Sequence, residues 1–349
     1  MAISQAAIDD LARRGADRGV DLSLGIELVE SRLGELTSAD LPLIAATSRH
    51  LVDAGGKRFR PMLVLLTGLL GSREATDADL VDAAAIVELV HLSTLYHDDV
   101  IDAADRRRGA TAAHIKWSNT TAILTGDFLL ARASELSAQL GVEVTRIMAR
   151  TIADLCSGQI REVQGSAEAV AHGMPSITAD RQHYLTVIGE KTASLIASSC
   201  RLGALLSGQS PEAIETLTVY GWRLGMAFQL ADDVLDLAGE VGESGKLPGA
   251  DLREGVQTLP VLLALEADGP DSELSKLLDG LGEPDQDDAI ARALELMRGH
   301  PAMDHARDAA RQESEAAKRA LDELPTGPEH EVVLDGLRHL AEYAVDRLS

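Results

Sequence analysis

Two short acidic motifs are the residues best suited to chemistry in this sequence. Each places aspartates at positions i, i+1 and i+4, so two of the three lie on one helix face about one turn apart. Like charges at this spacing oppose helix formation by roughly 0.2–0.5 kcal/mol per pair. A sequence that breaks a local rule twice in the same way commonly does so for function. The motifs consist of Asp98, Asp99 and Asp102, and of Asp232, Asp233 and Asp236.

Divalent metal binding would explain both motifs. Magnesium prefers oxygen and typically takes one or two carboxylates together with phosphate oxygens and water. A single DDxxD motif is more often a solvated helix end, but two copies flanked by apolar helix favour several Mg2+ ions held around one diphosphate. A ferritin-like di-iron site is the competing arrangement, because Glu88 and His91 match its Glu-x-x-His motif. None of the other nine histidines has a glutamate three residues earlier, so that alternative is set aside.

Cations suited to phosphate binding lie in two glycine-containing segments. Residues 55–61, GGKRFRP, join a flexible turn to Lys57 and two arginines, which offer a point charge and planar forks for phosphate oxygens. A helix end followed by surface charges explains this segment equally well. Residues 106–109, RRRG, follow the first acidic motif directly, and a solvated turn is the plain alternative there.

Four further polar residues could contribute to such a site. Lys191 and Thr192 stand inside a run of small and apolar residues that reads as a helix. Gln229 precedes the second acidic motif by one turn, and Lys246 lies in a glycine-rich segment after it. A lysine inside such a helix is not easily dismissed as a surface residue.

The composition indicates a globular protein that does not bind nucleic acid. The 349 residues carry a formal net charge of −24, whereas nucleic-acid binders need a basic face. No apolar stretch has the length of a transmembrane helix, and the first twenty residues show no signal-peptide core, so we expect a cytoplasmic protein. Cys156 and Cys200 are far apart in apolar or small-residue contexts, which predicts reduced, buried thiols without a chemical role.

The hydrophobic periodicity predicts an all-α protein without a convincing strand. Residues 1–25 are polar and glycine-bearing and are expected to include a disordered segment, and residues 26–349 are expected to form one helical domain. Residues 239–255, rich in glycine and acid, predict a mobile loop. The expected helices span residues 41–54, 61 onward, 76–102, 119–140, 142–165, 178–207, 211–237, 287–298, 305–324 and 331–348.

The motifs together resemble the polyprenyl synthetase family, the trans-isoprenyl diphosphate synthases. The resemblance is closest to bacterial long-chain members that make quinone side chains, particularly the menaquinone-associated type. It implies a bundle of antiparallel helices around a deep central cavity, usually as a homodimer. The matching segments are GGKRFRP at 55–61, ELVH at 88–91, HDDVIDAADRRRG at 97–109, GDFLL at 126–130, EKT at 190–192, FQLADDVLD at 228–236 and GKLPGADLREG at 245–255.

The resemblance also implies roles for single residues. The isopentenyl diphosphate would be bound by Lys57, Arg60 and His91, with Arg108 assisting. The allylic diphosphate would contact Arg107, Lys191 and Lys246. Thr192 and Gln229, together with Lys191, would stabilise the developing carbocation and its leaving group. The magnesium ligands would be Asp98, Asp102 and Asp232, supported by Asp99, Asp233 and Asp236.

The expected activity is metal-assisted condensation of isopentenyl diphosphate with an allylic diphosphate. Ser93 and Thr94 lie one turn before Asp98, and their small side chains predict an open tunnel and a product longer than farnesyl, whereas Tyr96 should face elsewhere. A farnesyl or geranylgeranyl diphosphate synthase is the alternative product class. A class I terpene cyclase and a catalytically silent subunit are rivals with other activities.

Overall fold

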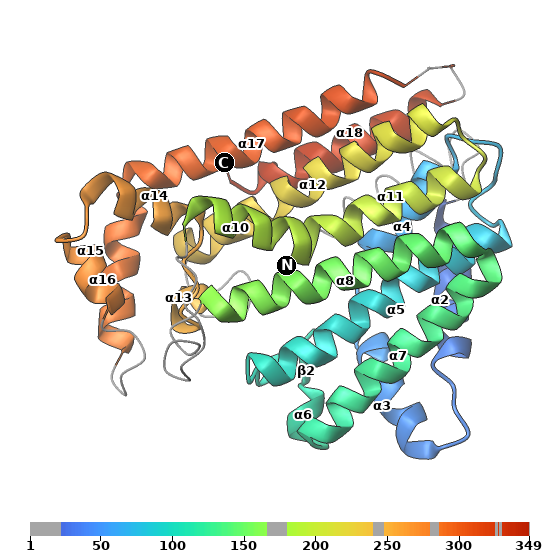
Figure 1. Ribbon diagram of the computed structural model, residues 1–349, viewed down its shortest axis with the longest axis horizontal. Helices are drawn as coiled ribbons and strands as arrows, with labels where there is room; N and C mark the ends of the chain where they lie inside the picture. Colours follow the sequence, from blue (N-terminus) through green and yellow to red (C-terminus); the bar gives the residue numbers. More distant parts are fainter. Residues whose placement is uncertain are drawn as a thin grey trace.

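The computed structural model describes residues 22–165, 180–239, 248–279, 286–324, 327 and 330–348, and nearly all of its regular structure is helical (Figure 1). The all-α prediction is therefore confirmed. The elements are α2 Leu22–Leu36, α3 Pro42–Asp53, α4 Phe59–Gly68, α5 Ala78–Ile101, β1 Arg106–Arg107, β2 Ala110–Thr111, α6 Ala113–Lys116, α7 Asn119–Leu140, α8 Val142–Gly165, α10 Arg181–Ile188, η1 Gly189–Ala193, α11 Ser194–Leu206, α12 Pro211–Ala238, α13 Ala250–Arg253, α14 Leu259–Asp268, α15 Glu273–Asp279, α16 Asp287–Arg298, α17 Pro301–Leu321 and α18 Glu331–Asp346.

Helices α5 and α12 carry the two acidic motifs, and both begin at side-chain caps. The Asp77 carboxylate accepts a hydrogen bond from the backbone N–H of Asp79 at 3.1 Å at the start of α5. The Ser210 hydroxyl accepts one from the N–H of Ala213 at 3.2 Å at the start of α12. Such caps satisfy donors that have no partner within the helix. Pro211 follows in the first turn of α12, as the sequence predicts.

Two hydrophobic clusters fill the interior, and α12 belongs to both. The larger cluster gathers side chains of α2, α4, α5, α7 and α11, and Tyr220 and Leu224 of α12 join it. The smaller cluster gathers side chains of α14, α16 and α17, and Leu230 and Val234 of α12 join that one. Figure 1 shows α12 running beside α11 and α17, in agreement with its packing contacts.

A two-residue hairpin corrects the expectation of no strand. β1 and β2 pair antiparallel, with Arg106 opposite Thr111 and Arg107 opposite Ala110. Arg108 and Gly109 form the turn between them, both with positive φ angles, 51° and 76°. This conformation matches the twist of short hairpins but is costly for a residue with a side chain. Side-chain contacts must therefore hold Arg108 in place.

Several helix boundaries differ from the sequence expectation. α4 begins at Phe59, so Pro61 lies inside its first turn instead of opening it, and α17 begins at Pro301 instead of residue 305. The predicted helix over residues 178–207 is divided by a π-helical turn, η1. α2 starts at Leu22, before the expected domain start at residue 26, because Leu22 is already buried.

Parts of two predictions concern residues outside the described ones. Residues 1–21 of the expected disordered segment and residues 240–247 of the expected loop 239–255 lie there, while α13 forms within the rest of that loop. Among the described helices, none combines the length and the apolar character that crossing a bilayer requires.

Candidate active site

A cavity of about 670 Å³ lies between α5, α8, α10, η1 and α12. One part of its wall is acidic and includes residues of both motifs, and another part carries cations. The rest is largely apolar, with side chains from α5, α7, α8 and α10. The apolar lining residues include Val90, Leu95, Leu130, Ile152, Leu155 and Val187.

Five of the six predicted aspartates face this one cavity. They are Asp98, Asp102, Asp232, Asp233 and Asp236. Asp99 does not line it: this residue is fully buried and accepts a hydrogen bond from Arg107 Nε at 2.6 Å. Its contribution to the site therefore passes through the arginine. The two motifs, far apart in sequence, do converge.

The acidic wall carries negative charge that its own surroundings only partly neutralise. Burial raises the pKa of Asp98 to about 6, and Asp102 adds to this while Lys191 opposes it. Burial likewise raises the pKa of Asp233 to about 7, although hydrogen bonds from Tyr184 and Gln229 lower it. Carboxylates in this state favour a bound cation, because a divalent ion supplies the missing charge.

The residues present fit magnesium that is shared with substrate. Among the described residues, no three acidic, histidine or cysteine side chains already form a group that could hold a metal ion by itself. Magnesium typically binds through one or two carboxylates and completes its shell with phosphate oxygens and water. Two separate carboxylate groups across a cavity suit ions bridged by a diphosphate better than a metal cage made only of protein.

The π-helical turn η1 places Lys191 and Thr192 in the cavity. Lys191 Nζ forms an ion pair with Glu162, and although burial alone would lower its pKa, Glu162 and Asp98 raise it above the ordinary value. Thr192 Oγ1 donates to Gln229 Oε1 at 2.9 Å. Lys191, Thr192 and Gln229, predicted as a catalytic group, thus lie together in the structure, and all three line the cavity.

A second interaction connects this group to the second motif. Gln229 Nε2 donates to Asp233 Oδ1 at 2.8 Å, and the Tyr184 hydroxyl donates to the other oxygen of the same carboxylate. Asp236 accepts hydrogen bonds from the backbone N–H groups of Ala250 and Asp251 at 3.1 and 3.2 Å. The second motif is therefore oriented by neighbours on both sides.

Cations line the part of the cavity near α4 and the hairpin. Arg60 is buried, its Nε has no hydrogen-bond partner, and burial lowers its pKa to about 10. Burial and the neighbouring arginines, Arg60 first, lower the pKa of His91 well below its ordinary value, so this imidazole is neutral at pH 7. Arg107 lines the cavity as well. A buried guanidinium whose Nε lacks a hydrogen-bond partner is an indication of an anion site.

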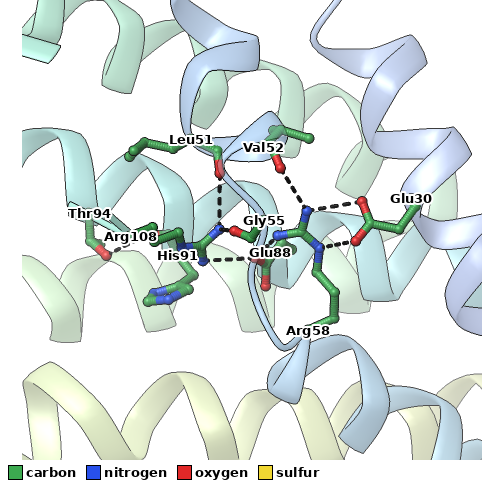
Figure 2. A network of polar contacts seen from close by, with 9 residues as sticks. All are labelled: Glu30, Leu51, Val52, Gly55, Arg58, Glu88, His91, Thr94 and Arg108. Carbon is green, nitrogen blue, oxygen red and sulfur yellow. Dashed lines mark hydrogen bonds and ion pairs between the residues drawn. The ribbon is translucent and has the colours of Figure 1, made fainter. Parts of the chain in front are cut away.

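Two other predicted cations in the described part of the chain, Lys57 and Arg108, do not line the cavity. Lys57 lies nearby, and burial together with the charge of Arg347 lowers its pKa. Arg108 binds protein groups instead, donating to the carbonyls of Leu51 and Gly55 and to Glu88 (Figure 2). Lys246 lies outside the described residues.

Several residues of the site were missed by sequence reasoning. Arg347, from the end of α18, donates to Asp232 Oδ1 at 2.7 Å and lies 5.1 Å from the ring centroid of Phe228. Asp251 lines the cavity, and burial next to Asp233 raises its pKa. Tyr184, Glu162 and Arg347 come from segments without a recognisable motif, so no signal marked them. The aspartate of the matched segment GKLPGADLREG is Asp251, which position in the motif alone could have indicated.

One cysteine prediction is wrong. Cys200 is buried as expected, but Cys156 is exposed and lines the cavity from α8. Ile152, Leu155 and Ile160 around Cys156 line the cavity wall, and sequence alone does not distinguish such a wall from a closed core.

An all-α bundle with two acidic motifs facing a group of arginines across one cavity is the arrangement of an isoprenoid synthase. The chain belongs to the polyprenyl synthetase family, whose model matches residues 41–297. A nonaprenyl diphosphate synthase of Mycobacterium tuberculosis is 45% identical over 326 residues, which cover 93% of this chain and 92% of that protein.

Solved structures agree. A polyprenyl synthase from Caulobacter crescentus, crystallised with calcium and isoprenyl diphosphate, superposes with a TM-score of 0.83 at 34% identity and covers 98% of both chains. A heptaprenyl diphosphate synthase from Staphylococcus aureus gives a TM-score of 0.83 at 31% identity, over 93% of this chain and 98% of that one. The predicted fold, family and enzyme class, a prenyltransferase that makes polyprenyl diphosphates, are confirmed.

Proposed function

We propose that this enzyme condenses isopentenyl diphosphate with an allylic diphosphate, repeatedly and with Mg2+, to give a medium- or long-chain all-trans polyprenyl diphosphate. The observation that carries the proposal is the single cavity in which both acidic motifs face Arg60 and His91. The two substrates then have separate binding places: the allylic diphosphate lies among the metal-binding carboxylates, and isopentenyl diphosphate lies among the basic residues. The predicted use of the product in a quinone side chain stays a prediction.

The first substrate is bound at the acidic wall. Asp98, Asp102 and Asp232 would hold magnesium, which when bound neutralises the departing diphosphate and so assists cleavage of the allylic C–O bond. Lys191 lies beside Asp98 and contributes a cation to the same leaving group. The electron pair of the broken bond leaves with the diphosphate, and positive charge appears on the allylic carbon.

Thr192 and Gln229 face the positive charge that forms on the allylic carbon. Thr192 and Gln229 are joined by their hydrogen bond, and their oxygens give the cavity a local dipole near the acidic wall. The isopentenyl double bond attacks the carbon, and the released diphosphate accepts the proton that restores an alkene. The apolar walls keep water from the cation.

The second substrate is bound by two cations and one neutral imidazole, which come from three segments. Arg60 comes from α4, His91 from α5, and Lys57 precedes α4. Because His91 is neutral at pH 7, it acts as a hydrogen-bond donor while the arginine supplies charge. The buried position of Arg60 strengthens its attraction for a phosphate oxygen, since little water screens it.

The test is an assay of the purified protein with Mg2+, labelled isopentenyl diphosphate and geranyl, farnesyl or geranylgeranyl diphosphate as primer, followed by sizing of the products. We expect products longer than geranylgeranyl and no elongation without a divalent metal. Products of twenty carbons or fewer would support the shorter-chain alternative. Reaction of an allylic diphosphate without isopentenyl diphosphate would indicate a cyclase, and no reaction without a second protein would indicate a subunit.

We also propose a homodimer, in agreement with the family resemblance. Exposed apolar side chains on neighbouring α3 and α7 support it, among them Leu43 at 54% and Leu124 at 60% exposure. Light scattering of the purified protein during size-exclusion chromatography should give a mass twice the chain mass of 37.0 kDa. We retain the cytoplasmic location as part of the same proposal, since both substrates are charged, water-soluble diphosphates.

A further inference from the structure

Two arginines with strained backbones converge on one buried carboxylate. Arg58 and Arg108 have φ angles of 49° and 51°, and they are two of three non-glycine residues with positive φ among the described residues. Such conformations are costly for residues with a side chain and persist only where the surroundings enforce them. Glu88 Oε1 accepts a hydrogen bond from each, at 2.8 Å from Arg58 Nη1 and 3.2 Å from Arg108 Nη2 (Figure 2).

The remaining donors of the two arginines tie three chain segments together. Arg58 also binds Glu30 of α2 and the carbonyl of Val52 near the end of α3. Arg108 binds the carbonyls of Leu51 and Gly55, so the hairpin is fixed to the turn that precedes α4. Glu88 itself stands on α5. The carboxylate therefore lies at the junction of α5, the turn and the hairpin.

Gly56 shows how tightly this junction is packed. A Cβ atom at Gly56 would lie 2.7 Å from Arg108 Nη1 and 2.9 Å from Arg58 Nη1. The backbone of the turn thus passes directly against both guanidinium groups. Any side chain at residue 56 would push one of them away from Glu88.

The segments joined at Glu88 are those that carry the cations of the proposed isopentenyl diphosphate site. Lys57 and Arg60 lie on either side of Arg58 in the chain, and His91 follows Glu88 by three residues on the same helix. Glu88 is 2% exposed. Glu30 and Glu88 together balance the charges of Arg58 and Arg108, so the positive charge offered to an anion comes from Lys57 and Arg60.

We propose that Glu88 is a positioning residue that holds the Arg58 and Arg108 segments so that Lys57, Arg60 and His91 converge on one diphosphate. This inference rests on the proposed function, because it concerns the site given there to isopentenyl diphosphate. If the role of Glu88 were purely structural, its replacement would lower the stability of the fold and would affect the binding of both substrates equally.

The experiment compares Glu88→Gln, Glu88→Asp and Asp82→Asn in steady-state kinetics with each substrate varied in turn, together with thermal unfolding. Asp82 is a matched control: it lies on the same helix and forms an ion pair with Arg32 of α2 at 2.7 Å. We expect Glu88→Gln to raise KM for isopentenyl diphosphate about 10- to 100-fold, as small misplacements in a binding site do. KM for the allylic diphosphate should change less than about threefold, and Asp82→Asn should show no such split.

Glu88→Asp keeps the charge but shortens the side chain, so it can no longer reach both arginines. It should show the same selective rise in KM, and it decides the question if the glutamine variant does not fold. An unchanged KM for isopentenyl diphosphate, or equal rises in both KM values that follow the loss of thermal stability, would overturn the inference. Wild-type enzyme that does not consume isopentenyl diphosphate would instead overturn the proposed function.

Discussion

His91 illustrates how its surroundings decide the charge state of one side chain. Burial removes water from the imidazole, and Arg60, Arg108 and Arg107 add positive charge around it. Both effects oppose protonation and lower its pKa. In the proposed isopentenyl diphosphate site, the imidazole would therefore contribute a hydrogen bond to the anion, and the guanidinium groups would contribute the charge.

The neutral state of His91 gives a prediction for two substitutions. Glutamine also offers an uncharged N–H donor, so His91→Gln should raise KM for isopentenyl diphosphate less than about tenfold. Leucine offers none, and His91→Leu should raise KM by roughly 10- to 100-fold, which corresponds to the loss of a hydrogen bond to a charged group. Kinetics at about pH 7.5, above the ordinary histidine pKa, compare the two variants. If glutamine proves as harmful as leucine, the site requires a cationic His91.

Five of the six aspartates of the motifs could be placed at the cavity from the sequence, whereas Asp99 and the partners of the motifs could not. Spacing alone indicates that Asp98 and Asp102 share a face, and the apolar flanks indicate that the face is buried. Arg347 and Tyr184 contact the second motif from other helices, and only the tertiary structure brings them there. Arg58 was placed in a cationic segment, but its buried pairing with Glu88 depends on a left-handed backbone that the sequence does not reveal.

At the scale of elements, the π-helical turn η1 determines where Lys191 and Thr192 point. A π turn contains one residue more per hydrogen-bonded ring than an α-helix, and such turns frequently occur at functional sites. Helix α8 approaches this turn closely at Gly158. A Cβ atom there would lie 2.7 Å from the backbone nitrogen of Lys191 and 2.9 Å from Glu190 Cβ.

The close approach predicts a large effect of one methyl group. Gly158→Ala should displace η1 and lower kcat about 10- to 100-fold, because Lys191 and Thr192 would shift relative to the acidic wall. Gly34→Ala is the control: Gly34 lies inside α2, a Cβ atom there would meet nothing within 4 Å, and alanine should stabilise the helix by up to about 1 kcal/mol. Kinetics and thermal unfolding measure both. A fully active Gly158→Ala enzyme would show that the turn tolerates movement.

Element boundaries were predictable where local chemistry marks them. The caps at Asp77 and Ser210 set the starts of α5 and α12. The hairpin was missed because strands of two residues have no alternating pattern, and its turn uses arginine where glycine or asparagine is usual. The π turn was missed because apolar periodicity continues through it from α10 to α11.

At the scale of the whole molecule, the cavity extends from the acidic motifs along an apolar wall. Ser93 lines it with a buried hydroxyl that has no hydrogen-bond partner, and Thr94 lies beside it. Tyr96 points away, as predicted, and its hydroxyl donates to the carbonyl of Thr47. The tyrosine ring on this turn therefore lies outside the cavity, whereas Ser93, Thr94 and Leu95 line it.

This shape predicts that Ser93→Phe shortens the product. The added ring would fill space beside the first motif into which a growing chain must extend, so growth should stop several isoprene units earlier. Mass spectrometry of the products measures the change. Ser134→Phe adds the same ring to an exposed position on α7 and should leave the length distribution unaltered. An unchanged distribution for Ser93→Phe would exclude this route for the tail.

Helix α12 supplies side chains to both hydrophobic clusters, and this has a consequence for how the protein unfolds. Neither half of the molecule possesses a complete interior without it, so the two halves should lose their structure together on heating, in one cooperative transition. Separate expression of the two halves would leave one of them without its central helix, and that fragment would expose apolar surface. The second acidic motif thus lies on a helix that, together with α17, joins the two hydrophobic clusters.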